Sequence, residues 1–95
     1  MKITVKRKVL KDIEKVPNDI KELVLIQLRE LKKSESLNEF QNVRKMEGTD
    51  EPYYRMQLRT YRLLIKYEQE TKTVTAYALT HRKDSYKKEN LPWRR

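Results

Sequence analysis

Residues 53–67 read YYRMQLRTYRLLIKY, and this stretch alternates polar and apolar side chains at the period of a β-strand. In its first half, Met56 shares an apolar face with its neighbours at positions two residues away, while Arg55, Gln57 and Arg59 fall on the opposite face. One face can therefore pack a core while the other presents arginines to the solvent.

This stretch and the one that follows predict a meander of three strands. The strands are expected to run from Tyr53 to Arg59, from Tyr61 to Tyr67 and from Thr73 to Thr80. Because the connections are as short as Thr60 and residues 68–72, successive strands should be antiparallel neighbours. The third strand is expected to place Val74, Ala76 and Ala78 on one face and Thr75, Tyr77 and Leu79 on the other.

The residues before the meander predict one strand and two helices. Residues 2–7 alternate as a strand, and residues 8–15 then switch to helical spacing. Pro17 should end the first helix because it lacks an N–H, and Asn18 is expected to cap the second. That second helix carries an apolar stripe from Ile20 to Leu31, which needs a sheet to cover it.

Residues 34–52 show no clean period and are rich in turn formers, which predicts an ordered loop. Gly48, the only glycine, is expected to make the turn into the sheet. Apolar side chains should pin this loop to the body, namely Leu37, Phe40, Val43 and Met46.

The C-terminal residues give a weaker pattern. Residues 83–90 predict one or two helical turns that Pro92 ends, and Trp93 with Arg94 and Arg95 either docks on the body or remains free. Together the elements predict a single α+β domain over residues 1–95, with an N-terminal strand, a helical hairpin and an antiparallel meander, the helices on one face of the sheet.

Composition limits the classes of protein to consider. Of the 95 residues, 37% are hydrophobic and 39% are charged, a balance that disordered chains share, but the clear periodicity argues for a folded domain. The absence of cysteine and the single histidine exclude thiolate sites and sites with two imidazoles. The longest aliphatic run, residues 23–26, is far too short to span a membrane, and the N-terminus lacks a signal-peptide pattern. A cytoplasmic location is the default expectation.

The net charge of +9 is unevenly distributed along the chain, with +5 in residues 1–34 and the largest excess after residue 52. Residues 53–95 carry eleven Lys or Arg and four Asp or Glu, whereas residues 35–52 are net acidic. A basic surface of this kind binds polyanions in a salt-dependent way, and it equally suits an acidic protein.

The basic residues lie beside aromatic ones in two segments, 53–62 and the sequence HRKDSY at 81–86. Arginine forks onto phosphate oxygens and stacks on flat rings, so this combination favours RNA or DNA as a partner. The alternative interpretation is a solvated sheet face with cross-strand ion pairs. On that alternative His81 is a surface residue at a strand end, and Tyr86 packs on the sheet.

Four segments in this order, KMEG at 45–48, YRMQLR at 54–59, YRLLIKY at 61–67 and HRKDSY at 81–86, resemble the RelE/ParE superfamily of toxins from toxin–antitoxin systems. The resemblance covers nearly the whole chain. For the RelE branch it implies an mRNA interferase, a ribosome-dependent endoribonuclease that cleaves mRNA in the A site by attack of a 2′-hydroxyl on the adjacent phosphate. It implies neither a metal nor another cofactor.

The same resemblance implies an acidic antitoxin protein as partner, in a toxin–antitoxin hetero-oligomer, with the ribosome and its mRNA as target. Two alternatives remain open. One is a ParE-like inhibitor of DNA gyrase without nuclease activity, and the other is a non-toxic nucleic-acid-binding module.

By position, the resemblance implies that Arg55 is a catalytic basic residue of the first active strand and that Arg62 stabilises the phosphate. It also implies that Arg82 lies near the leaving group and that Tyr86 stacks on a base. His81 is assigned a supporting acid/base role, because its ordinary pKa suits proton transfer near neutrality. Gln57 stands where RelE toxins often have a lysine, and an amide cannot act as a general base. The expected RNA-contacting residues are Lys45, Gln57, Arg59, Lys83 and Lys87.

Overall fold

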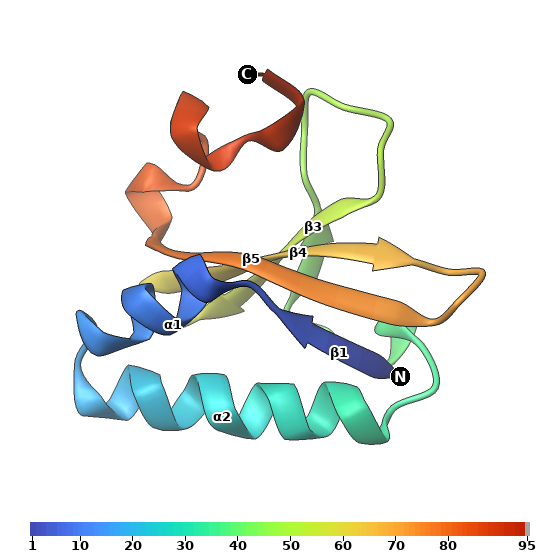
Figure 1. The fold of residues 1–95 in the computed structure, drawn as a ribbon, viewed down its shortest axis with the longest axis horizontal. Coiled ribbons are helices and arrows are strands. Elements are labelled where there is room, and N and C mark those ends of the chain that lie inside the picture. Colours follow the sequence, from blue (N-terminus) through green and yellow to red (C-terminus); the bar gives the residue numbers. More distant parts are fainter. Residues whose placement is uncertain (95) are drawn as a thin grey trace.

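A five-stranded sheet forms the middle layer of the protein in a computed structural model, which describes residues 1–94. The elements are β1 (Lys2–Val5), α1 (Arg7–Glu14), α2 (Asn18–Lys33), β2 (Val43–Lys45), β3 (Tyr53–Leu58), β4 (Tyr61–Glu68) and β5 (Thr73–His81). The strand order is β1-β5-β4-β3-β2, with β1 parallel to β5 and the other neighbours antiparallel. Figure 1 shows both helices on one face of the sheet and the C-terminal segment on the other. The α+β prediction is confirmed.

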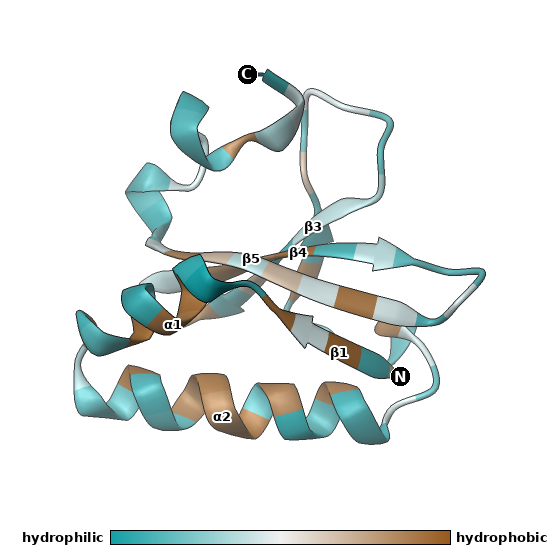
Figure 2. Ribbon diagram, in the orientation of Figure 1, coloured by the Kyte–Doolittle hydropathy of each residue, from teal (hydrophilic) through white to brown (hydrophobic). Residues whose placement is uncertain are grey.

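The main core lies between the helices and the sheet. Val9 of α1 and Val24 of α2 are fully buried against Met56, Leu63 and other strand residues. The prediction that one face of residues 53–58 packs a core is therefore confirmed, since Met56 and Leu58 both enter it. Figure 2 shows the hydrophobic positions gathered on the strands and along α2, whereas most turns are hydrophilic.

The helix boundaries follow the prediction with one difference. Pro17 rather than Asn18 is the residue before α2, and the Pro17 carbonyl accepts from the N–H groups of Ile20 and Lys21. The Asn18 side chain makes no capping bond, because Asn18 is already the first helical residue. Proline suits this place because its fixed φ leads into a helix.

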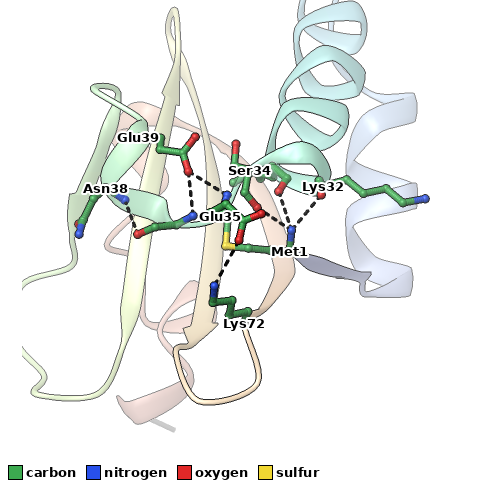
Figure 3. Close-up of polar contacts among 9 residues, drawn as sticks. Met1, Lys32, Ser34, Glu35, Asn38, Glu39 and Lys72 are labelled. Carbon is green, nitrogen blue, oxygen red and sulfur yellow. Dashed lines mark hydrogen bonds and ion pairs between the residues drawn. The ribbon is translucent and has the colours of Figure 1, made fainter.

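The end of α2 is tied to neighbouring segments by polar contacts (Figure 3). The Met1 amino group donates to the carbonyls of Lys32 and Ser34, at 2.9 and 2.8 Å. A cation at this position suits the negative end of the helix dipole. The next turn, η1 (Leu37–Glu39), is held by a capping box between Ser36 and Glu39.

The predicted loop 34–52 contains a strand that the sequence reading missed. β2 is only three residues long and pairs with β3, with Val43 opposite Met56 and Arg44 opposite Arg55. The expected anchors Leu37, Phe40, Val43 and Met46 all pack on the two hydrophobic clusters of the protein. Gly48 adopts a φ of 88°, so it makes a turn that other residues would strain.

A β-bulge in β5 overturns part of the expected strand pattern. Leu64 pairs with Ala78 and Ile65 pairs with Ala76, which leaves Tyr77 as an extra residue. The alternation therefore reverses after Tyr77. Ala78 turns away from the helices and Leu79 joins the helix-side core, the opposite of the prediction.

The outer face of the sheet, opposite the helices, carries a second hydrophobic cluster under the C-terminal segment. Its buried members are Met46, Tyr53, Leu64, Ala78 and Leu91. Trp93 docks there, with its ring centroid 4.9 Å from that of Tyr53. The segment forms three 3₁₀ turns, η2 (Arg82–Asp84), η3 (Lys88–Asn90) and η4 (Pro92–Arg94). The turn η3 ends before Pro92, as predicted, and Pro92 then begins η4. Arg95 lies outside the described residues.

The buried hydroxyl of Tyr77 makes the stability of this outer cluster depend on pH, which can be tested. Its hydroxyl is buried without a hydrogen-bond partner among residues 1–94. Burial, and then the nearby Tyr53 and Tyr86 hydroxyls, raise the pKa of Tyr77 well above its ordinary value. The native protein then holds a proton that the unfolded chain releases near pH 10, so stability should fall as pH rises beyond about 10. We expect Tyr77→Phe to flatten that loss in urea denaturation between pH 9 and 11; an unchanged slope would contradict this account.

None of the helices within residues 1–94 combines the length and the hydropathy that a membrane span requires.

Candidate nucleic-acid interface

A row of polar side chains crosses the outer face of the sheet beside the C-terminal segment. In this row, Gln57 of β3 pairs with Arg62 of β4, and Arg62 pairs with Thr80 of β5. Arg55 lies two residues along β3 from Gln57, so its Cβ is a diagonal neighbour of Arg62, about 7–8 Å away. The register therefore brings Arg55 and Arg62, both predicted to be catalytic, together on one face.

Arg62 is half-buried and has no partner of its own. Its Nε atom is buried without a hydrogen bond, and no ion pair among residues 1–94 involves its guanidinium. A cationic group that is partly desolvated and unpaired is costly unless an anion completes it. Arg62 is therefore the strongest candidate on this face for contact with a phosphate.

Arg55 is held in place by Tyr86 and by β2. Its Nη1 donates to the Tyr86 hydroxyl at 3.0 Å and to the Lys45 carbonyl at 2.9 Å. The Arg55 guanidinium carbon lies 6.0 Å from the centroid of the Tyr86 ring. The Tyr86 hydroxyl also accepts from the N–H of Glu47, at 2.9 Å. These contacts fix one edge of Tyr86 and leave the ring partly exposed.

A buried pair of hydroxyls sets the corner that returns Tyr86 to the sheet. Thr80 and Ser85 are buried, and their hydroxyl oxygens are 3.1 Å apart. At the start of the corner, the N–H of Arg82 donates to the Thr60 carbonyl at 2.7 Å. The Arg82 side chain is exposed and makes no hydrogen bond or ion pair with residues 1–94. The corner thus brings Arg82 next to the turn between β3 and β4.

Comparison with solved structures shows which proteins share this fold. The RelB–RelE antitoxin–toxin complex from Methanococcus jannaschii contains a chain that is 26% identical, with a TM-score of 0.74 over 87% of this chain and 94% of that one. The archaeal RelE–RelB complex from Pyrococcus horikoshii gives 23% identity and a TM-score of 0.70 over 85% and 93%. The YoeB/ParE toxin from Agrobacterium tumefaciens gives 12% and 0.65 over 85% and 98%.

The chain has a RelE-like toxin fold. No model of a protein family matches the sequence, and comparison with curated protein sequences finds no significant match. The likeness of this RelE-like chain to known toxins is therefore carried by the three-dimensional structure. Its neighbours are toxins of toxin–antitoxin systems, which supports a toxin role.

His81 does not join the arginines of this RelE-like chain. It pairs with Tyr61, which packs against the helix-side core, and the two rings are 5.4 Å apart. The imidazole lines a hollow together with Lys8 and Asp12 of α1. His81 therefore lies on the helix side of the sheet and Arg62 on the outer face, because the bulge at Tyr77 reverses the alternation at the end of β5.

Lys45 and Arg59 also lie away from the arginine pair. Lys45 pairs with Tyr54 on the helix side, and its ammonium donates to the carbonyls of Thr49 and Glu51, at 3.0 and 2.6 Å. Arg59 sits in the turn between β3 and β4 with a φ of 60°, and its guanidinium forms an ion pair with Asp19 of α2. The prediction that Arg59 continues the face of Arg55 is wrong, since β3 ends at Leu58.

Lys83 and Lys87 are exposed on the C-terminal segment. The Lys87 ammonium lies 3.2 Å from the Asp84 carboxylate, whereas Lys83 has no side-chain partner within residues 1–94. Gln57 is exposed and donates weakly to the Arg59 carbonyl, at 3.3 Å. These three side chains can approach a bound polyanion from the margins of the site.

Arg44 is a basic residue of this face that the sequence reading missed. It pairs with Arg55 across β2 and β3, so the two side chains share the outer face. The Arg44 guanidinium donates to the carbonyls of Gln41 and Val43 and is exposed. The basic pair Arg44–Lys45 is visible in the sequence, but only the register of β2 separates the two residues by face.

Within residues 1–94, no three His, Asp or Glu side chains are grouped in a way that could hold a metal ion.

Proposed function

We propose that this RelE-like chain is the toxin of a toxin–antitoxin pair and that it cleaves mRNA on the ribosome. The observation that carries the proposal is the unpaired, half-buried Arg62 beside the Arg55–Tyr86 contact on an otherwise basic face. The fold is that of RelE toxins. A ParE-like gyrase inhibitor is less favoured, because the neighbour with ParE in its name shares only 12% identity.

The proposed reaction is an in-line displacement at phosphorus. The 2′-oxygen forms a bond to the adjacent phosphorus, and the bond from phosphorus to the 5′-oxygen breaks. The 2′-hydroxyl gives up its proton to solvent water, and the leaving 5′-oxygen takes one up from the solvent. The products are a 2′,3′-cyclic phosphate and a 5′-hydroxyl. Charge accumulates on the phosphoryl oxygens, so preorganised cations are the main requirement.

Arg62 and Arg55 suit the stabilisation of that charge. An arginine stays protonated near neutral pH and offers several hydrogen-bond donors in a fixed plane, but it cannot act as a proton acceptor there. Gln57 cannot accept one either, and His81 lies on the helix side of the sheet. We therefore assign the protein's contribution chiefly to electrostatic stabilisation by the arginines and to base stacking by Tyr86, with Arg82 near the leaving group.

We also propose an acidic antitoxin as partner, since the structural neighbours are described as RelB–RelE antitoxin–toxin complexes. The net charge of +9 suits such a partner. We expect this toxin to act on the translating ribosome in the cytoplasm, with A-site mRNA as its substrate.

Brief induction of the chain in growing cells, followed by primer-extension mapping of mRNA, tests the proposal. We expect growth arrest with cuts phased to codons in translated messages. Arrest with intact translated mRNA would overturn the ribonuclease assignment. A DNA-supercoiling assay with purified gyrase then decides whether the ParE-like alternative takes its place.

His81→Gln is expected to leave the pattern and rate of mRNA cleavage within about twofold of the wild type, because the imidazole packs on Tyr61 away from Arg62. The same primer-extension time course measures it. A decrease of roughly 100-fold in the cleavage rate, the scale of general acid–base catalysis, would show that His81 takes part in the reaction.

A further inference from the structure

A basic hollow lies on the outer face of the sheet, separated from Arg62 by the C-terminal segment. It has a volume of about 350 Å³ and is lined by residues of β3, β4 and β5, by Lys6 and by Pro92. Small-molecule sites begin at about 300 Å³, so the hollow is large enough for a single nucleotide. None of the roles described above uses it.

Two lysines give this hollow its charge. Lys66 of β4 lies in the middle, with its ammonium 5.5 Å from the centroid of the Tyr53 ring. Lys6 follows β1 at the sheet edge and is exposed. Neither ammonium forms an ion pair with residues 1–94. Both lysines are thus available to a phosphate.

Aromatic side chains form the adjoining wall. Tyr77, the bulge residue, contributes a partly exposed ring, and its edge packs on Tyr53 with the centroids 5.5 Å apart. Trp93 and Tyr53 hold the rest of the wall in place. A fixed aromatic ring beside lysines suits base stacking next to a phosphate contact, the combination that proteins use for single-stranded RNA.

One carboxylate also lines this hollow. Glu68, at the end of β4, lines the hollow on the side away from Lys6. In the order β1-β5-β4, β1 and β4 are two strand spacings apart, about 10 Å. A carboxylate repels phosphate but accepts hydrogen bonds from the amino group of a base. The base should therefore lie toward Glu68 and the phosphate toward Lys6 and Lys66.

We propose that this hollow is a second nucleotide subsite, which binds one amino-bearing base and its phosphate from the RNA strand. The assignment to RNA rests on the proposed function, but binding in the hollow requires no cleavage. Lys66 and Arg62 are four residues apart on the same strand, about 13 Å. A strand held at Arg62 can therefore place a nearby nucleotide in the hollow.

Titration of the full chain with CMP, UMP and inorganic phosphate, followed by amide NMR shifts and by the fluorescence of the single tryptophan, tests this subsite. We expect CMP to shift the signals of Tyr77 and Lys66 and to bind more tightly than UMP, which lacks the amino group. Lys66→Gln should weaken CMP binding by roughly tenfold, the scale of one charged hydrogen bond. Lys33→Gln, an equal charge change at the exposed end of α2, should have no effect.

Equal binding of CMP and inorganic phosphate, or equal weakening by both lysine substitutions, would overturn the subsite. Arg62→Ala separates this test from that of the proposed function, because Arg62 does not line the hollow and CMP should still shift the signals of Tyr77 and Lys66 in this variant. If mRNA is never cut but CMP still binds, the ribonuclease proposal fails and the subsite stands. If mRNA is cut but CMP does not bind, the reverse holds.

Discussion

Arg62→Ala is expected to reduce mRNA cleavage by roughly 100-fold or more, the scale measured for removing one preorganised donor to a developing oxyanion. The physical reason is the state of the side chain. Arg62 is half-buried with an unpaired Nε, so the side chain has lost part of its hydration without gaining a hydrogen bond or an ion pair within residues 1–94. A phosphate supplies the missing charge, and that charge grows in the transition state. Primer-extension rates after brief induction measure the loss.

Two companion variants make the result specific. Arg62→Lys keeps the charge but loses the planar fork, so it should fall between the wild type and Arg62→Ala. Arg29→Ala removes an equal charge from the exposed side of α2, on the other face of the sheet, and should cleave as the wild type does. A similar loss in Arg29→Ala would indicate a general effect of net charge, and the assigned role of Arg62 would then be wrong.

Removal of Arg62 should not damage the fold. The side chain makes no hydrogen bond with residues 1–94, and its neighbours Leu63 and Leu64 carry the packing of β4. We expect the unfolding midpoint of Arg62→Ala to match or slightly exceed that of the wild type, since an unpaired, partly buried charge is unfavourable. A folded but inactive variant is the outcome that distinguishes a role in cleavage from a role in stability.

The alternation of side chains in residues 53–67 was enough to predict the faces of β3 and β4, because long strands with one buried face fix their own register. Arg55 and Arg62 were placed together for that reason. β2 escaped prediction because three residues carry too little periodicity, so the sequence could not show on which side of the sheet Lys45 lies.

His81 shows why the rest of the site was not predictable. Simple alternation along β5 puts it on the same face as Tyr77, but one extra residue at the bulge reverses the order from Ala78 onward. No residue in the bulge is a glycine or another typical marker, so the sequence carries no local signal for it. Likewise, the unusual φ of Arg59 depends on the short turn that follows β3.

Gln57→Lys is expected to accelerate cleavage by roughly tenfold or more, a conservative part of the 100-fold to 10,000-fold range of general acid–base catalysis. Gln57 pairs with Arg62 across β3 and β4, is exposed, and makes one weak bond to the Arg59 carbonyl. A lysine at this position lengthens the side chain by one atom and adds a cation beside Arg55 and Arg62 on the outer face. Its exposed ammonium can reach the phosphate without a change in the backbone.

The position of Gln57 makes a direct comparison possible. Gln57→Met has a similar length but no charge, so it should cleave at the rate of the wild type, as should a lysine placed on the helix side of the protein. If the added lysine donates or accepts a proton in the reaction, the cleavage rate of Gln57→Lys should also depend on pH in a way that the wild-type rate does not. An increase without a new pH dependence would assign the gain to electrostatic stabilisation alone. No increase at all would mean that the amide already fills its role at this site, and that the absence of a lysine there does not limit the reaction.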